Sequence, residues 1–579
     1  MIGAKAIYNS LINNKVKNAF IYSGGAIMSL VDEFKHNKIN YFINNHEQNC
    51  GHAATAYAKS SGKPGVVIVT SGPGLTNLIT PILDATNDST PLVVFSGQVP
   101  LNAMGTLAFQ ECPAVEITKS CTKWSYCAQK NDNLFQLTNE AFKVATSGKK
   151  GAVHIDLPKC ILTSINGTNT NFNQPIYQIP SSTKLSFEYL SYLDNLIKQS
   201  TKPIIIIGKG SNDYSEELRK FTIRNNIPIT STIHSMGTFD ENHKLSLGFL
   251  GMHGHPVANH SVQNADLIIA IGSRFDDRTT GNLSLFAPKC KNIIHVNIEK
   301  SELNKIVKTN LRMMVHNIHM DCGNFLKEMN YYQHIHIDDN YIRKEWFAQI
   351  NYWKKTYPII YNKLPNRLST QMIIECINKL INKNNMSNNT IITSGVGNHQ
   401  MMAAQFIRWT QPNQFITSGS LGVMGVGLPY AIGAQIANPT KTVIDIDGDG
   451  SFNHTLGDLQ TVFRYKLPIK IFIMNDGQMS MVRAWEKLFY NENYIATDCS
   501  SNPNYTMLAN SYGISSIDLY KQEHMESIID YVLKYDKPII CNVKVDSDLC
   551  LPLVAPGKAL DDMILLNMEI NNLSGNAPS

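Results

Sequence analysis

Apolar residues between positions 442 and 485 predict two strands joined by a helix. The first strand is a β-branched run, Val443, Ile444 and Ile446, of the kind found in buried parallel strands. Apolar residues spaced for one face of a helix follow: Leu456, Leu459, Val462 and Phe463. The second strand covers residues 467–474. Because right-handed crossovers make such strands parallel, both are expected to end at the same edge of a sheet.

Two acidic turns follow these strands. Asp449 lies in an Asp-Gly-Asp-Gly turn, and Asp476 lies in an Asn-Asp-Gly turn. Such residues commonly do no more than form turns. Here, however, the two turns lie one crossover apart, at the edge where open α/β sheets bind ligands. Two carboxylates beside a glycine-rich turn suit Mg²⁺ completed by the phosphates of a ligand, so we predict a metal–diphosphate site.

The same alternation of strands and helices recurs in three successive blocks. Short apolar runs alternate with helical stretches, as in doubly wound parallel sheets. A polar, Asn-rich and Pro-punctuated stretch, 164–183, separates the first two blocks. We therefore predict an α/β protein with three doubly wound parallel-sheet domains in series. The expected divisions are a first domain 1–165, a linker 166–190, a central domain 191–345, a linker 346–368, a third domain 369–554 and a polar tail 555–579 that is mobile or acts as a lid.

Composition narrows the function classes. The 579 residues are too many for one core, and 43% hydrophobic with 17% charged residues is typical of a globular protein. The net charge of +5 comes without a basic, aromatic-rich cluster, so nucleic acid binding is not expected. The charge-free stretch between Arg408 and Lys441 is broken by Pro429 and several glycines, so no membrane span is expected.

Cysteine usage and the first residues bear on the compartment. The eleven cysteines form no CxxC pair, which indicates a reducing interior, cytoplasmic or otherwise intracellular. Residues 1–15 have neither the apolar core of a signal peptide nor the Arg/Ser-rich character of a transit peptide, and we expect neither. They predict an amphipathic helix instead.

Three segments resemble a known family. Gly448-Asp449-Gly450 with Asn475-Asp476 resembles the metal motif of thiamine-diphosphate enzymes, in which a second Asn is usual at position 476. Residues 46–80 resemble the cofactor-activating segment of the acetohydroxyacid (acetolactate) synthases, and residues 274–281 resemble a signature of these synthases. The resemblance runs through nearly the whole chain. It implies a pyrimidine-binding first domain, an FAD-type, transhydrogenase-like central domain and a diphosphate- and Mg²⁺-binding third domain.

The resemblance also implies cofactor-binding residues. Glu47 alone would be an acid at a helix N-terminus, stabilising by about 0.3–1 kcal/mol. In the family the matching Glu bonds the aminopyrimidine and favours the imino tautomer that removes the C2 proton of the cofactor. Met424 matches the apolar wedge that bends the cofactor. The metal ligands implied are Asp449, Asp476 and Gln478. The other cofactor-binding residues implied are Gly25, Gly397, Asn398, His399, Gly448, Gly450, Ser451 and Met481.

Substrate and flavin residues follow from the same resemblance. Arg278 is similar to the cation that binds the carboxylate of the second 2-oxoacid, although a surface ion pair with Asp276 or Asp277 is the alternative. The other substrate residues implied are Phe109, Gln110, Lys159 and Trp485. The catalytic residues implied are Glu47, Gln110, Lys159 and Arg278. The FAD residues implied are Lys149, Gly208, Gly210, His253, Arg274, Asp277 and Asn297. Lys209 stands where a third glycine is usual, Lys149 where an Arg is usual, and Asn297 where an Asp is usual.

The function implied is that of an acetolactate synthase. Pyruvate is decarboxylated on thiamine diphosphate, and the two-carbon unit joins pyruvate or 2-oxobutyrate to give 2-acetolactate or 2-aceto-2-hydroxybutyrate, in valine and isoleucine biosynthesis. Because Glu47 and Asp449 lie in different domains, we expect a homodimer or homotetramer, and the family also has small regulatory subunits. Two alternatives stay open: another thiamine-diphosphate decarboxylase or carboligase, including an FAD-independent synthase, and a catalytically silent regulatory paralogue.

Overall fold

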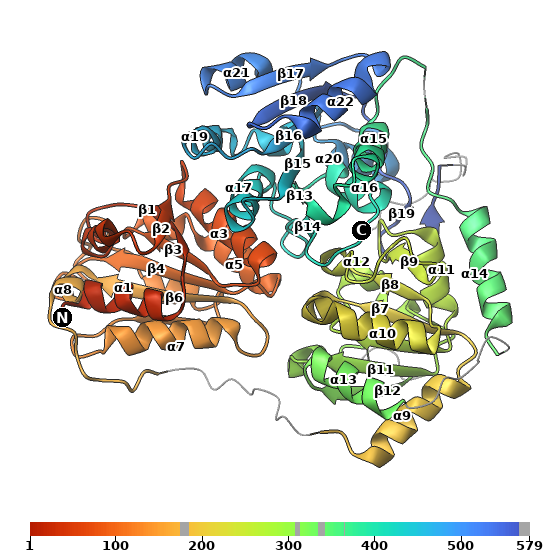
Figure 1. The fold of residues 1–579 in the computed structure, drawn as a ribbon, viewed down its shortest axis with the longest axis horizontal. Coiled ribbons are helices and arrows are strands. Elements are labelled where there is room, and N and C mark those ends of the chain that lie inside the picture. Colours follow the sequence, from red (N-terminus) through yellow and green to blue (C-terminus); the bar gives the residue numbers. More distant parts are fainter. Residues whose placement is uncertain (174–183, 307–312, 334–341, 364, 567–579) are drawn as a thin grey trace.

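Over the residues that the structure describes, the chain forms three sheets of six parallel strands and one short antiparallel ribbon (Figure 1). The computed structural model describes residues 1–173, 184–306, 313–333, 342–363 and 365–566. In Figure 1 the first domain is red to orange, the central domain yellow to green, and the third domain cyan to blue. Helices cover both faces of each six-stranded sheet. The predicted α/β class, with three parallel-sheet domains in series, is confirmed.

The first sheet has the strand order β2-β1-β3-β4-β6-β5. Alternate residues of one strand enter two separate cores, as Val67 and Ile68 do, which explains why its strands are apolar throughout. The strands are β1 (Asn18–Tyr22), β2 (Asn40–Phe42), β3 (Gly65–Val69), β4 (Leu92–Gln98), β5 (Trp124–Cys127) and β6 (Ala152–Pro158). Helices α1 (Gly3–Asn13) and α7 (Leu134–Thr146) pack on one face, with α3 (Glu47–Ser61) and α5 (Ile79–Asn87) on the other. Shorter helices are α2 (Met28–Asp32), α4 (Pro73–Thr76), α6 (Ala114–Thr118) and α8 (Lys159–Thr163).

The central sheet has the strand order β12-β11-β10-β7-β8-β9. Its strands are β7 (Pro203–Ile207), β8 (Ile229–Ser231), β9 (Ser246–Phe249), β10 (Leu267–Ile271), β11 (Asn292–Asn297) and β12 (Met314–His319). One face carries α9 (Phe187–Gln199), α10 (Ser215–Asn225) and α13 (Cys322–Tyr332), and the other carries α11 (Pro256–Asn264) and α14 (Lys344–Thr356). The short α12 (Asp277–Thr280) follows β10.

The third sheet has the strand order β14-β13-β15-β16-β18-β17. Its strands are β13 (Thr390–Ser394), β14 (Phe415–Ile416), β15 (Thr442–Gly448), β16 (Lys470–Asn475), β17 (Ser515–Leu519) and β18 (Ile539–Lys544). Its helices are α15 (Thr370–Lys383), α16 (Asn398–Phe406), α17 (Gly427–Ala437), α18 (Asp449–Phe452), α19 (Leu459–Arg464), α20 (Ser480–Phe489), α21 (Tyr505–Ser511) and α22 (Met525–Lys534). The chain leaves β13 toward β14 and leaves β15 toward β16, so the strand order reverses between β13 and β15. Ligands bind at such reversal points.

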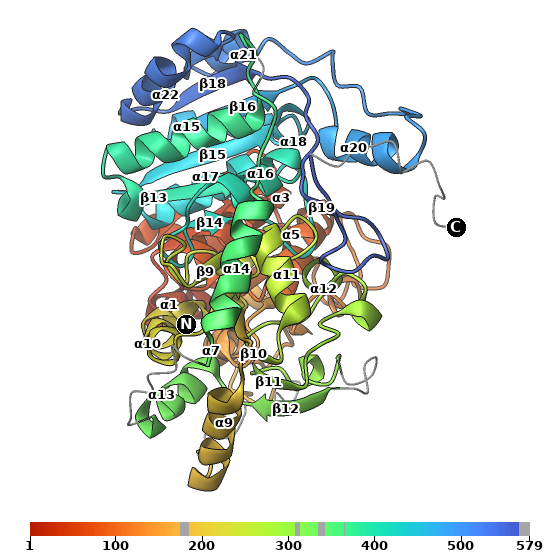
Figure 2. The ribbon, with the colours of Figure 1, turned by 90° about the vertical axis from the view of Figure 1, so that its right-hand side faces the viewer.

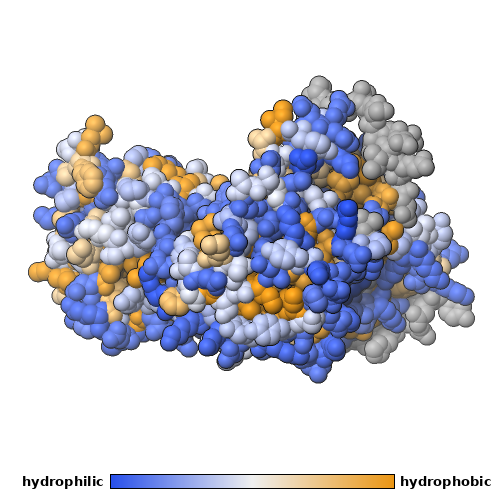
Figure 3. Space-filling view, turned by 90° about the horizontal axis from the view of Figure 1, so that it is seen from above, coloured by the Kyte–Doolittle hydropathy of each residue, from blue (hydrophilic) through white to orange (hydrophobic). Residues whose placement is uncertain are grey.

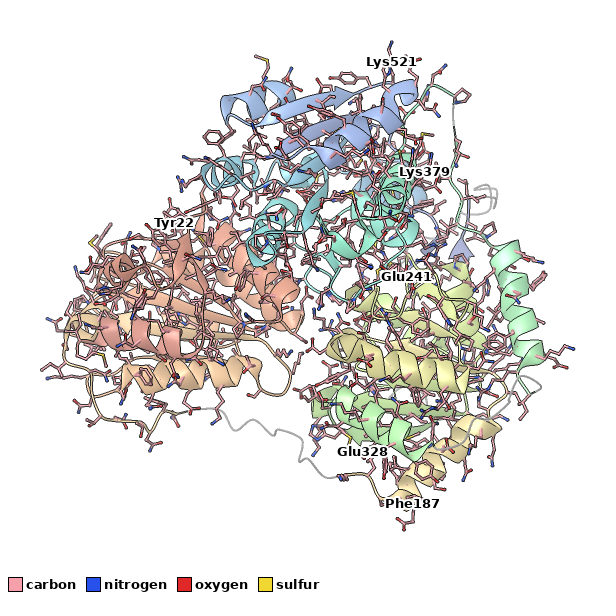
Figure 4. All side chains as sticks on the ribbon, in the orientation of Figure 1. Tyr22, Phe187, Glu241, Glu328, Lys379 and Lys521 are labelled. Carbon is pink, nitrogen blue, oxygen red and sulfur yellow. The ribbon has the colours of Figure 1, made fainter. Side chains whose placement is uncertain are left out.

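The first and third domains share one hydrophobic core. Helix α3 packs directly against α17, and both contribute to a cluster that also contains residues of β3 and β15. The backbones approach so closely that a Cβ at Gly433 would clash with the carbonyl of Ala53. Tyr22, at the carboxyl end of β1, packs against the same core (Figure 4). This contact fixes the orientation of the two sheets relative to each other.

The central domain is joined to the third by hydrogen bonds from both backbone and side-chain groups. Glu241 and Trp409 exchange hydrogen bonds, with Glu241 N donating to the Trp409 carbonyl and Trp409 N donating to Glu241 Oε2 (3.3 Å); Figure 4 labels Glu241 at this junction. Arg219 donates to the Thr410 carbonyl (2.8 Å). These contacts bury the boundary between the two domains. Figure 3 shows that the apolar groups left on the viewed surface form separate patches rather than one continuous band.

Three expectations about local structure need correction. The predicted helix through Leu456 and Phe463 is split into a 3-10 turn (Leu456–Asp458) and α19, and Phe463 is 53% exposed rather than buried. The segment expected as a linker, 346–368, contains most of α14. Figure 2 shows α14 running along the central domain, where Trp346 and Trp353 are buried.

The tail is also ordered over its described part. Strands β19 (Leu553–Val554) and β20 (Met563–Ile564) pair, Leu560 is fully buried, and its carbonyl accepts a hydrogen bond from Asn259 Nδ2 (3.0 Å). Residues 555–566 therefore pack on the central domain instead of being mobile, while 567–579 lie outside the described residues. The domain boundaries themselves stay a prediction. None of the helices in the described part of the chain has both the length and the apolar character needed to cross a bilayer.

The shared core predicts an unusual cost at Gly433. Glycine in a helix is normally less stable than alanine by about 1 kcal/mol, so a Gly→Ala change would ordinarily stabilise α17. Here the added Cβ would meet the Ala53 carbonyl. We expect Gly433→Ala to destabilise the chain by about 1–3 kcal/mol, as overpacking does. The measurement is the midpoint of denaturant unfolding.

The matched control is Gly457→Ala. Gly457 also lies where the first and third domains meet, but a Cβ there would have only an ordinary contact, 3.6 Å from Asn45 Nδ2. An unchanged midpoint for Gly433→Ala would show that the two helices separate readily and that their close approach is unimportant.

Candidate active site

The predicted acidic turns meet at the carboxyl edge of the third sheet. Strands β15 and β16 pair in parallel, with Gly448 opposite Met474, so Asp449 and Asp476 both follow at the same edge. Asp449 is the first residue of α18, is 1% exposed, and accepts hydrogen bonds from Gly477 N (3.1 Å) and from Asn502 Nδ2. Asp476 accepts from Gln478 N (3.1 Å) and from Ser480 Oγ. The predicted juxtaposition of the two carboxylates is therefore observed.

The electrostatics of this pair favour a bound cation. Burial, and then the charge of Asp476, raise the pKa of Asp449 to about 6. Burial also raises the pKa of Asp476. Among the described residues, no three or more His, Cys, Asp or Glu side chains group to hold a metal. Two carboxylates would thus need further oxygen ligands from backbone, ligand or water, as Mg²⁺ commonly takes them.

A second turn at the sheet reversal point lies against the acidic one. Gly397 has φ +156°, and α16 begins with Asn398 directly after it. His399 Nε2 is buried without a hydrogen-bond partner in the described structure, although Asp447 Oδ1 lies 3.3 Å away. A Cβ at Gly448 would lie 2.7 Å from His399 Nδ1, so only glycine lets the imidazole pack there. An anionic group at this turn would find an imidazole nitrogen that forms no hydrogen bond in the described structure but lies beside the Asp447 carboxylate.

The segment that carries Met424 closes this site. Gly422 and Gly425 both have positive φ, +74° and +83°, which glycine adopts without strain. Gly425 N donates to Ser451 Oγ (2.9 Å), which lies in α18 beside Asp449. Met424 is half-buried, and its Cε lies 3.9 Å from the position of a Cβ at Gly450. The predicted wedge therefore lies directly beside the acidic turn that contains Asp449, here called the metal turn.

Glu47 lies in the first domain, whereas the two acidic turns lie in the third. It begins α3, whose N-cap residue His46 accepts from Gln48 N through its side chain. Glu47 is 9% exposed, and its Oε2 accepts from Asn77 Nδ2 (3.0 Å). None of the hydrogen bonds or ion pairs between described residues joins Glu47 to Asp449. A Cβ at Gly25, in the loop after β1, would have no neighbour within 4 Å, so this loop borders open space.

The predicted substrate residues divide into two groups. Arg278, Met481 and Trp485 line one cavity. Phe109, Gln110 and Lys159 do not line it: Phe109 is 90% exposed, the neighbouring Leu107 is 96% exposed, and Lys159 is exposed at the start of α8. Leu107 and Gln110 have positive φ, +58° and +63°. A single chain thus leaves this loop without a covering surface.

The ion pair considered for Arg278 is not formed. Asp276 instead pairs with Arg274 (3.5 Å) and caps α12 by accepting from Thr279 N (3.0 Å). Arg278 is exposed, and its Nη1 donates to Met252 Sδ (2.9 Å). No ion pair among the described residues involves Arg278, so its guanidinium retains donors for an anionic ligand.

The same cavity contains every residue implied for FAD. It measures about 720 Å³, lies between the three domains, and is lined by Lys149, Gly208, Gly210, His253, Arg274, Asp277 and Asn297. Gly208 must be glycine because a Cβ there would clash with the backbone of Gly272. His253 Nδ1 is buried without a partner in the described structure. Burial lowers the pKa of Lys149, which lies 3.7 Å from Glu302.

Comparison with known proteins decides the family. The family descriptions "Thiamine pyrophosphate enzyme, N-terminal TPP binding domain", "central domain" and "C-terminal TPP binding domain" match residues 1–117, 192–329 and 395–543. The chain is 41% identical to the mitochondrial acetolactate synthase catalytic subunit of Saccharomyces cerevisiae, over 97% of this chain and 84% of that protein. The chain belongs to the acetolactate synthase family of thiamine-diphosphate enzymes. Further members are acetolactate synthase isozyme 2 large subunit of Escherichia coli, at 35% identity over 97% of this chain and 99% of that protein, and chloroplastic acetolactate synthase 3 of Brassica napus, at 36% over 97% and 86%.

Family membership confirms the predicted resemblance and the dependence on thiamine diphosphate. It does not test the individual site residues. The structure adds residues that the motifs had not indicated, chiefly Asn502, whose amide reaches Asp449 from 53 positions away. The second omission is a buried group at the junction of the three domains, which includes Asp84, Asp88 and Lys59. The only sequence signal for these was the presence of charges inside otherwise apolar helical stretches.

The buried carboxylates predict pH-dependent metal binding in this acetolactate synthase family member. With its pKa raised to about 6, Asp449 is largely protonated below that pH and is then a poor Mg²⁺ ligand. At a fixed, subsaturating Mg²⁺ concentration with thiamine diphosphate, the ligand-induced rise in the unfolding midpoint should therefore shrink between pH 7 and pH 5. Asp449→Asn should lose most of this rise at both pH values.

Asp518→Asn is the control for this experiment. Asp518 lies near the carboxyl end of β17 in the same sheet, where it accepts from Asn542 Nδ2 (2.8 Å). It should retain the Mg²⁺-dependent rise. Equal rises at pH 5 and pH 7 in the unmodified chain would contradict a role for Asp449 as a ligand.

Proposed function

We propose that this chain is the catalytic subunit of an acetolactate synthase that uses thiamine diphosphate and Mg²⁺. The proposal rests above all on the edge between β13 and β15. The acidic turn, the His399 turn and the Met424 segment converge there, as a diphosphate with its metal would require. The reaction joins pyruvate, after loss of CO₂, to a second 2-oxoacid, and its products serve valine and isoleucine biosynthesis.

The residues present fit the cofactor. Asp449, Asp476 and an oxygen of Gln478 would hold the Mg²⁺, while Gly397, Asn398, His399 and Ser451 would bind the diphosphate. When bound, thiamine diphosphate would supply a nucleophilic C2 that adds to the carbonyl carbon of pyruvate and a thiazolium ring that takes up the electron pair when CO₂ leaves. Met424 and Met481 exclude water beside it. Glu47, whose carboxylate accepts a hydrogen bond from Asn77, would hold a proton at a ring nitrogen of the aminopyrimidine.

Substrate recognition is assigned to the cavity side of the site. Arg278 would bind the carboxylate of the acceptor 2-oxoacid, because a planar guanidinium matches a carboxylate with two parallel hydrogen bonds. Trp485 lines the same cavity and would limit the size of the acceptor. Gln110 and Lys159 would contact the reacting groups from the first domain, and Phe109 would cover them.

The assembly we propose is a homodimer, or a tetramer built from it. Within one chain Phe109 and Leu107 face solvent, and Glu47 is not bonded to the metal turn. If the first domain of one chain faces the third domain of another, that contact would cover Phe109 and Leu107 and would bring Glu47 to the metal turn of the other chain. The exposed apolar side chains Val482, Tyr490 and Ile495, on α20 and the loop after it, offer a surface for such a contact.

FAD binding is part of the proposal. The cavity has a volume suited to a cofactor and carries the cations Lys149, Lys209 and Arg274, which would offset the charge of a diphosphate. FAD takes no electrons in the main reaction of the family, so its role would be structural. Two of the relatives are named catalytic or large subunits; by analogy we propose that a small regulatory subunit can bind and that the compartment is intracellular.

The first test is the reaction itself. With pyruvate, thiamine diphosphate and Mg²⁺, the purified chain should form acetolactate, and Glu47→Gln should reduce the rate by about 10²–10⁴-fold because the amide cannot share a proton in the same way. Glu33→Gln, which changes another largely buried acid of the first domain, is the control and should retain activity. Assays with and without FAD test whether the reaction requires the flavin. Acetaldehyde as the sole product would exclude the synthase, and full activity of Glu47→Gln would favour the silent paralogue.

The second test asks whether one site is built from two chains. Chains with Glu47→Gln and chains with Asp449→Asn should each be inactive as homodimers. When the two are co-expressed, a mixed dimer would contain one site with both changes and one site with neither. About half the dimers would be mixed, so we expect about a quarter of normal activity. No recovery, despite mixed dimers confirmed by two different affinity tags, would place both residues in a site within one chain.

A further inference from the structure

The segment that carries Met424 is held in place from another domain. Residues 417–425 run from the end of β14 to the start of α17 in the third domain. Their most buried partners, however, come from α5 and α3 of the first domain. Asp84, Asp88 and Lys59 are all buried, and each bonds this segment.

Asp84 acts on the segment through one hydroxyl group. Ser418 Oγ donates to Asp84 Oδ1 (2.5 Å) and accepts from both Gly422 N and Val423 N (3.1 Å each). The carboxylate therefore fixes the direction of the hydroxyl, and the hydroxyl's lone pairs bind two successive backbone amides. Those amides immediately precede Met424. Ser418 and Asp84 are 1% and 0% exposed, so water does not substitute for either partner.

Hydrogen bonds also hold the two ends of the segment. Lys59 Nζ donates to the Thr417 carbonyl (2.8 Å), and Asp88 Oδ1 accepts from Ser420 N (3.0 Å). At the far end, Gly425 N donates to Ser451 Oγ and its carbonyl accepts from Thr455 Oγ1 (2.8 Å). Ser418 thus holds the two residues before Met424, while Ser451 and Thr455 hold Gly425 directly after it.

We propose that Asp84 is a positioning residue for the reaction: through Ser418 it sets the position of Met424, and hence the bent shape of thiamine diphosphate. This inference rests on the proposed function, which assigns Met424 its contact with the cofactor. It has a consequence for the assembly. Asp84 and Glu47 belong to the same domain, yet Asp84 acts on the Met424 of its own chain. In the proposed dimer, that Met424 faces the Glu47 of the other chain, so the two acids of one domain serve different active sites.

A purely structural role is the competing explanation. Asp84 also accepts a hydrogen bond from Tyr430 Oη, so the group could simply join the first and third domains. The two roles separate because Tyr430 lies in α17, whereas Ser418 bonds the Met424 segment. Tyr430→Phe removes the hydroxyl contacts with Asp84 and with Lys59 (3.3 Å) but keeps the bonds of Ser418, and Ser418→Ala removes the contact with the segment but keeps Tyr430.

The decisive measurement is exchange of the C2 proton of bound thiamine diphosphate with D₂O, followed by NMR after acid quench. This exchange requires the bent cofactor but no substrate. We expect Ser418→Ala and Asp84→Ala to slow it by about ten- to one-hundredfold, since a misplacement of about 1 Å costs that much. Asp84→Asn keeps an acceptor for Ser418 and should restore most of the rate. Tyr430→Phe should exchange at the normal rate even if its unfolding midpoint falls.

Complementation tests the assignment to one chain. Glu47→Gln chains co-expressed with Asp84→Ala chains should recover activity, because the mixed dimer retains one site with neither change when Asp84 acts on Met424 of its own chain. Normal exchange in Ser418→Ala, or slow exchange in Tyr430→Phe equal to that in Ser418→Ala, would overturn the positioning role. The mixture of Glu47→Gln and Asp449→Asn chains is the positive control. If that mixture recovers activity but the mixture in this test does not, the assignment to Met424 of the same chain is overturned. If the unmodified chain itself shows neither C2 exchange nor acetolactate formation, the proposed function fails instead.

Discussion

The packing of α3 against α17 is the contact on which the rest of the structure depends. Helix α3 begins at Glu47, and α17 begins just after the Met424 segment, so one helix pair locates two parts of the proposed active site. The absence of a side chain at Gly433 lets the backbones meet. Because this contact is buried, the first domain cannot change its orientation relative to the third domain without breaking the shared core.

Buried charge is treated in opposite ways at Asp88 and at the metal turn, while burial and the charge of Asp88 raise the pKa of the neighbouring Asp84 to about 6. At the domain junction, burial would raise the pKa of Asp88, but His234 and Lys59 keep it well below its usual range. That charge is compensated within the protein, and removal of one partner would leave a buried charge unpaired. At the metal turn, Asp449 and Asp476 are brought together with amide and hydroxyl donors only, and their pKa values rise. The two carboxylates at the metal turn are therefore less stable as anions than exposed carboxylates until a ligand binds, and such raised pKa values are typical of functional sites.

The sequence specified the strands and the acidic edge because these depend on short-range patterns. The apolar run around Ile444 could only be a buried strand, and the crossover then placed Asp449 beside Asp476. Phe463 was misjudged because helical spacing does not show where a helix is interrupted. The order around Leu560 and the burial of Trp346 depend on a surface provided by the distant central domain, which no local pattern reveals. Asp84 was missed for the same reason: its partner Ser418 lies 334 residues away.

Lys209 shows how a departure from the family pattern acquires a physical meaning. In the sequence, Lys209 stands where the family usually has a third glycine. In the structure its Nζ extends toward Asn413 of the third domain, 3.5 Å from Oδ1, and burial together with Lys59 lowers its pKa to about 8. Lys209 is half-buried, and among the described residues its ammonium has one weak hydrogen-bond partner, so a nearby anion would stabilise its charge. The change therefore adds a cation to the cavity as well as bulk, and a ligand with a diphosphate would relieve the cost of burying it.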